Sequence, residues 1–89
     1  MMYPFLQLED YTEIVHSQML DDGRVKVYIE KPVEGGFQSA TCYLPKYEWQ
    51  DISGFQSGEI DKYQELLESV SHLIMRFAKE GGFDSAANL

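Results

Sequence analysis

The chain of 89 residues has 15 acidic and 7 basic side chains and a formal net charge of −8. This length suits a single domain, which leaves roughly a third or more of the unfolded-chain surface exposed. The negative charge repels phosphate backbones and disfavours direct binding to nucleic acid, whereas it is compatible with a basic protein partner.

The segment before Tyr11 is apolar at four positions, and we expect it to form an edge strand or to pack beside a helix end: Tyr3, Phe5, Leu6 and Leu8. It is too short for a signal peptide and lacks the basic region and long apolar run of one. No stretch of the chain approaches the roughly 20 apolar residues that span a bilayer. Since the single cysteine, Cys42, cannot form an internal disulfide, the sequence predicts a cytoplasmic protein without membrane association.

Residues 12–20 and 24–32 are rich in β-branched and apolar side chains and predict two antiparallel strands joined by a three-residue loop at Asp21-Asp22-Gly23. Glycine can adopt the positive φ that closes such a loop. This register faces Met19 with Val25, Ser17 with Val27 and Val15 with Ile29. A two-residue turn would shift the register by one and place His16 beside Ile29, which makes a less apolar core.

A second hairpin is predicted around the two-residue turn Glu34-Gly35. Its facing pairs are Ile29 with Ala40, Val27 with Cys42 and Val25 with Leu44. Both hairpins therefore turn the same face of the middle strand towards the core. The opposite, outer face receives Lys26, Tyr28, Thr41 and Tyr43.

The connection from Lys46 to Ser57 shows no clean period, and a short turn of helix is expected at 46–52. Connections of this length often pack as compact loops or form binding surfaces. A long helix follows over 58–80, with Ser57 as the expected cap and Gly81 as the stop. Its apolar stripe is Ile60, Tyr63, Leu67, Val70, Ile74 and Phe77, widened by Leu66 and Leu73.

These elements predict an α+β fold, in which a three-stranded antiparallel β-meander packs against one long C-terminal α-helix. The segment before Tyr11 would add a fourth strand at the edge. A coiled coil is the alternative for the helix, but it needs a longer run of heptads, and the sheet also needs a cover. Residues 1–81 are expected to form the single domain and residues 82–89 a disordered tail.

No group of residues predicts catalysis, a cofactor or a metal. Cys42 is expected to point into the core, with His16 two strands away on the other face, so a thiolate would lack a base. His72 falls outside the apolar stripe and is expected to be exposed. Five carboxylates match no calcium loop and are interpreted as solvated charges of turns and edges: Glu9, Asp10, Glu13, Asp21 and Asp22.

Aromatic side chains are the least ordinary feature of the sequence. Interfaces favour tyrosine and tryptophan as anchors, although such rings also fill the space between a loop and a helix. The candidate interaction residues are Tyr28, Tyr43, Tyr47, Trp49 and Phe55.

Three stretches precede the long helix: Val25-Lys26-Val27-Tyr28-Ile29-Glu30, Glu34-Gly35-Gly36-Phe37 and Leu44-Pro45. Together they resemble the start of HicB-type antitoxin domains, over about residues 25–81. The resemblance implies a partial ribonuclease-H-like domain that binds and blocks a small basic ribonuclease toxin. The chain departs from that pattern by an extra strand before Val25, by a longer Lys46–Ser57 connection without the usual Gly-Cys after Leu-Pro, and by the lack of room for a DNA-binding segment.

The sequence thus predicts an acidic, cytoplasmic, non-enzymatic protein-interaction module. It would bind a protein partner through the aromatic outer sheet face and the 46–57 segment. Two alternatives remain open: an antitoxin-like neutraliser of a small basic ribonuclease, and a homo-oligomeric structural protein in which a sheet edge or the outer face pairs with itself.

Overall fold

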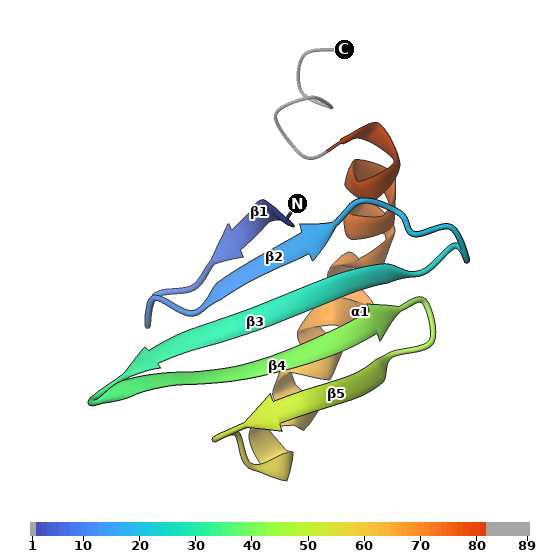
Figure 1. Cartoon of the computed structure of the whole chain (residues 1–89). Coiled ribbons are helices and arrows are strands. Elements are labelled where there is room, and N and C mark those ends of the chain that lie inside the picture. The colour runs from blue at the N-terminus through green and yellow to red at the C-terminus, as the bar shows by residue number, and fades with distance from the viewer. Residues whose placement is uncertain (1, 82–89) are drawn as a thin grey trace.

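The computed structural model describes residues 2–81. Its elements in chain order are β1 (Met2–Gln7), β2 (Glu13–Ser17), β3 (Val25–Val33), β4 (Gly36–Leu44), β5 (Glu48–Ser53) and α1 (Ser57–Glu80). The strands form one antiparallel sheet in the order β1-β2-β3-β4-β5, and α1 crosses one of its faces (Figure 1). The predicted α+β class and meander are confirmed, although the predicted three or four strands are fewer than the five present. The tail predicted for residues 82–89 lies outside the described residues.

The β3–β4 hairpin has the predicted register. Val25 pairs with Leu44, Val27 with Cys42 and Ile29 with Ala40, and all six side chains are 0% exposed. Gly35 adopts a φ of +84° in the turn, a conformation that costs glycine little. Each fully buried valine, leucine or isoleucine contributes about 1.5–3 kcal/mol relative to an exposed one, so this double row is the centre of the core.

The predicted register of the first hairpin is wrong by one residue. Ile14 pairs with Ile29 and His16 with Val27, so Ile14 and His16 face the core in place of Val15 and Ser17. The reason is that β2 ends at Ser17 and a longer connection follows. In that connection the N–H of Met19 donates to the carbonyl of Ala78 on α1, at 3.3 Å. The chain leaves the sheet to reach the helix, which the assumption of a three-residue loop did not allow.

The two outer strands complete the sheet. β1 pairs with β2, which confirms the first of the two expectations for the segment before Tyr11, an edge strand. Its Phe5 also lies 6.1 Å from the ring of Phe77 near the end of α1, as the second expectation had it. β5 pairs with β4, so the helical turn expected at 46–52 is wrong. The period of β5 is hidden in the sequence because Asp51 takes a φ of +52° beside an irregularity in the ladder, and because Tyr47, just after the cis Leu44–Pro45 peptide, takes a φ of +60°.

Helix α1 begins one residue earlier than predicted, and its N-cap is Gln56 rather than Ser57. The carboxylate of Glu59 accepts the N–H of Gln56 at 3.1 Å. Gly81 ends the helix in the left-handed conformation, as predicted. The buried residues of α1 are Leu67, Ile74 and Ala78, which pack on the sheet in the same core as β3 and β4, so a coiled coil is not formed. No helix within the described residues is long and apolar enough to cross a bilayer.

The corrected register of β2 predicts different sensitivity at neighbouring positions. His16 is 0% exposed, whereas Val15 is partly exposed on the outer face. We expect His16→Lys to lower the free energy of unfolding by about 3 kcal/mol or more, because it buries a charge without a partner, and Val15→Lys to lower it by about 1 kcal/mol or less. Chemical denaturation of both variants measures the difference. The opposite ranking would restore the register expected from the sequence.

Candidate functional site

The outer face of the sheet, opposite α1, is covered by no element within residues 2–81 (Figure 1). Two of the predicted interaction residues lie on it, because they alternate with the buried row. Tyr28 pairs with Thr41 and Tyr43 with Lys26 across the central hairpin. Both tyrosines are half-buried, and Thr41 between them is 3% exposed. Side chains of the outer face thus bury one another in part, although no second layer covers them.

The two tyrosines have different surroundings. The hydroxyl of Tyr28 donates to Oε2 of Glu30 at 3.0 Å. The ring of Tyr43 lies under the guanidinium of Arg24, whose Cζ is 4.4 Å from the ring centroid. The same guanidinium contacts Asp22 at 2.7 Å and Glu48 at 3.6 Å. Hydrogen bonds from the backbone N–H and then the side chain of Arg24 lower the pKa of Asp22 because they favour its charged form.

The other three predicted residues belong to the opposite side of the sheet. Trp49 on β5 pairs with the buried Cys42 on β4, and its indole N–H donates to Oε1 of Gln64 on α1 at 3.0 Å. Phe55 is 8% exposed and meets Tyr63 edge to face at 5.1 Å. Tyr47 also packs against the core. Trp49 and Phe55 thus connect β5 and the following segment to α1. All three rings pack on the core side of the sheet, away from the outer face that holds Tyr28 and Tyr43.

Cys42 lies in the core as predicted, but the expected position of His16 is wrong. His16 and Cys42 are on the same face, each opposite Val27, so two strand spacings of about 4.8 Å separate their backbones. Nδ1 of His16 lies 2.8 Å from the carbonyl of Ser17, and Nε2 has no hydrogen-bond partner among the described residues. The imidazole packs against the rings of Tyr3 and Phe5, with centroids 5.7 and 6.3 Å away. His16 is therefore a buried residue that β2 contributes to the core.

The five predicted carboxylates do not converge. Asp10 accepts the N–H of Thr12 at 3.0 Å and lies 3.7 Å from the ammonium of Lys31. Hydrogen bonding by Thr12, with a smaller contribution from Lys31, lowers the pKa of Asp10. Within residues 2–81 no three histidine, cysteine or acidic side chains are placed to hold a metal ion. His72 is exposed on α1, as expected.

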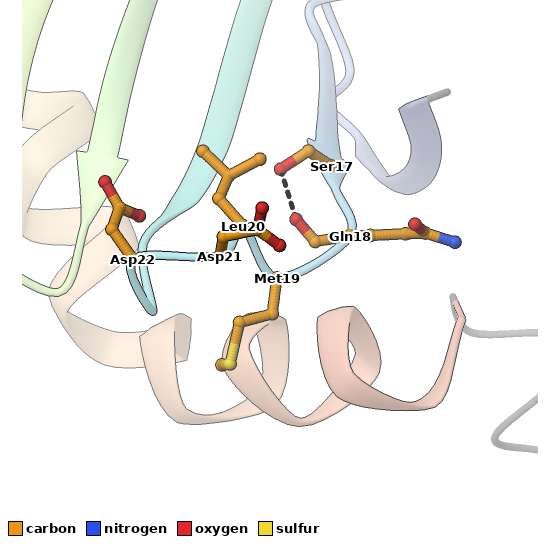
Figure 2. A pocket seen from close by; sticks show the side chains of 6 residues that line it. All are labelled: Ser17, Gln18, Met19, Leu20, Asp21 and Asp22. Carbon is orange, nitrogen blue, oxygen red and sulfur yellow. Dashed lines mark hydrogen bonds between the residues drawn. The ribbon is translucent and has the colours of Figure 1, made fainter.

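A shallow, open hollow lies at the turn after β2 (Figure 2). Six consecutive residues line it: Ser17, Gln18, Met19, Leu20, Asp21 and Asp22. The Ser17 hydroxyl donates to the carbonyl of Gln18 at 2.7 Å, and the Met19 side chain points towards α1 (Figure 2). The lining comes from one turn, and two of its polar groups are engaged locally: the Ser17 hydroxyl donates to the Gln18 carbonyl, and the Asp22 carboxylate accepts from the backbone and side chain of Arg24.

Sequence reasoning missed two features of the outer face. Glu13 stands directly opposite Glu30 across β2 and β3. Phe37 stands opposite Pro32 near the tip of the central hairpin and is 64% exposed. The signal for Phe37 was its place directly after Gly35-Gly36, whereas the acidic pair depends on the register of β2, which the sequence did not fix.

The burial of Cys42 predicts a pH dependence of stability. Burial, and secondarily the charge of Glu48, raises the pKa of this thiol from 9.0 to about 12. The folded state then holds the proton more tightly than the unfolded state, so stability is full below pH 9.0 and falls as the pH rises towards about 12. The slope is at most about 1.4 kcal/mol per pH unit. Denaturation of wild type and Cys42→Val across this range should show a shallower fall in the variant, and equal slopes would contradict the prediction.

The indole hydrogen bond of Trp49 predicts an energetic coupling between β5 and α1. We expect Trp49→Phe to lower the free energy of unfolding by about 1 kcal/mol, because the Gln64 carbonyl loses its donor. In a Gln64→Ala background the same substitution should cost about 0.5–1 kcal/mol less. Thermal and chemical denaturation of the four proteins of this cycle measure the coupling. Additive effects would show that the hydrogen bond does not stabilise the fold.

The comparisons with known proteins add no relative. No family model, no curated protein and no solved structure matches the chain. The similarity to HicB-type domains therefore stays a prediction from the sequence.

Proposed function

We propose that this chain is a small, non-enzymatic protein-interaction module of the cytoplasm that binds its partner through the outer face of the sheet. One observation supports the proposal most strongly: a five-stranded sheet has a helix on one face and, within the described residues, nothing on the other (Figure 1). Tyr28 and Tyr43 stand on the open face. Tyrosine is enriched in interfaces because its ring is apolar and its hydroxyl can pair with polar groups.

The segment 46–57 contributes to this proposal through its outward side. Glu48 pairs with Tyr43 and Gln50 with Thr41, so both extend the outer face by one strand. Its rings pack inward and hold this extension in place. A partner that covers Tyr28 and Tyr43 would therefore also contact β5.

The chemistry of the partner follows from charge. The formal net charge of −8 favours a basic protein and opposes nucleic acid. A neutraliser of a small basic ribonuclease is one form of this proposal, favoured by the same charge. The free, buried Cys42 is compatible with the reducing cytoplasm.

Homo-oligomerisation through a strand edge is the less favoured function. β1 contains Pro4 and a register irregularity between Pro4 and Leu6. The pairing of β4 with β5 shifts register between Ser39 and Thr41, which corresponds to Gln50 and Ser53 on β5. Such irregularities interrupt the row of hydrogen-bonding groups that another strand would need. The face of the sheet is therefore a more favourable binding surface than its edges.

Substitution of the outer-face tyrosines tests the proposed function. We expect Tyr28→Ser and Tyr43→Ser to reduce recovery of the partners captured from native lysate at least about tenfold, since loss of an interface anchor costs about 1.4 kcal/mol or more. His72→Ser, which alters an exposed ring on α1, serves as the control. Quantitative mass spectrometry measures recovery, and circular dichroism confirms that the variants fold. Equal recovery with all variants would reject this face as the interface.

A further inference from the structure

The central hairpin extends beyond its neighbours at one end of the sheet (Figure 1). β3 and β4 have nine residues each, whereas β2 has five and β5 has six. The last pair shared with β2 is Glu13 with Glu30, and three further pairs of the hairpin follow towards the turn. Pro32 and Phe37 are on the outer face of this extension, and Glu13, Tyr28 and Glu30 lie on the same face just before it. We call these five residues together the hairpin end.

The hairpin end has two solvent-exposed apolar side chains next to each other, Phe37 and Pro32. Phe37 is 64% exposed and stands opposite Pro32, which is also exposed. On β3, Tyr28, Glu30 and Pro32 follow at steps of two and so share one face. The apolar tip therefore continues the tyrosine face that the proposed function uses.

The charged side chains on the outer face of this region are acidic. Glu13 and Glu30 stand directly opposite each other, an arrangement of like charges that is unfavourable across a strand pair. Neither carboxylate has an ion-pair partner among residues 2–81. The neighbouring Lys31 lies on the opposite face of β3, because successive strand residues alternate, and its ammonium is paired with Asp10. Glu34 adds a further exposed carboxylate in the turn. A cationic partner would relieve this repulsion.

We infer that the hairpin end docks a basic, extended segment of another protein, with its cations over Glu13 and Glu30 and an apolar side chain against Phe37. Successive residues on one face of a strand are about 6.7 Å apart, so arginine and an aliphatic residue two positions apart match Glu30 and Pro32 in spacing. Arginine suits the acidic pair because its planar fork forms bidentate hydrogen bonds with carboxylates. The inference rests on the proposed function and adds the location and chemistry of the partner.

A peptide titration tests the inference on the full chain. The probe is a synthetic peptide that carries arginine two residues from a leucine, and its control has glutamate in place of arginine. We expect the arginine peptide to shift the backbone amide resonances of Glu13, Glu30 and Phe37 in the ¹⁵N-labelled protein. Phe37→Ser, and Glu13→Gln combined with Glu30→Gln, should each weaken binding about tenfold. Because Phe37 and both glutamates lie at the surface, these variants are expected to fold.

A matched control separates the hairpin end from general attraction to an acidic protein. Asp61→Asn combined with Glu65→Gln removes the same charge from exposed positions on α1 and should change the affinity less than about twofold. Equal weakening by both double variants, or equal binding of the glutamate peptide, would overturn the inference. Resonances of the hairpin end that move with protein concentration alone would also overturn it, because a second copy would then be the occupant.

Failure of this inference is distinguishable from failure of the proposed function. If the arginine peptide does not bind, while Tyr28→Ser and Tyr43→Ser still prevent capture of the native partners, the inference is wrong and the proposed function stands. If those tyrosine variants capture the partners normally, the proposed function is wrong whatever the peptide does. Binding of the chain to anionic lipid vesicles in place of the arginine peptide would reject the basic protein partner.

Discussion

The structure depends on the burial of one double row of side chains along the central hairpin. β3 and β4 each contribute three residues at 0% exposure, and α1 supplies the only described layer over them. Within residues 2–81 one sheet–helix interface holds this core. The apolar side of the hairpin therefore decides both where the helix packs and which sheet face stays open. The turn at Glu34-Gly35 sets that choice, because its length fixes the register.

The sequence predicted this central part of the fold because short turns permit few registers. It did not predict the pairing of β2, since Ile14 with His16 and Val15 with Ser17 both alternate an apolar with a polar residue. The rings of Tyr3 and Phe5 decide between them by providing apolar neighbours for His16. β5 was missed because left-handed residues at its start and within it interrupt the two-residue period.

Each residue of the candidate site could be placed on a face of the sheet only where the register of its strand was predicted correctly. Tyr28 and Tyr43 lie on the outer face because they belong to the well-determined hairpin. Trp49 and Phe55 could not be assigned to a face until β5 was recognised, and they pack inward. The opposed pair of Glu13 and Glu30 could not be found without the register of β2. Its unfavourable charge belongs to a surface rather than to the core, where a similar arrangement would cost far more.

Helix α1, the one helix of the described residues, follows all five strands in the sequence, and this order has a consequence for biosynthesis. Residues 2–53 of the sheet leave the ribosome before residues 57–80 of α1. Until α1 has emerged, the meander lacks the helix that packs on its apolar side in the described structure. Domains that expose apolar strands during translation are prone to aggregate. The irregular edges of β1 and β5, which hinder strand addition, are therefore useful to the nascent chain before the native core exists.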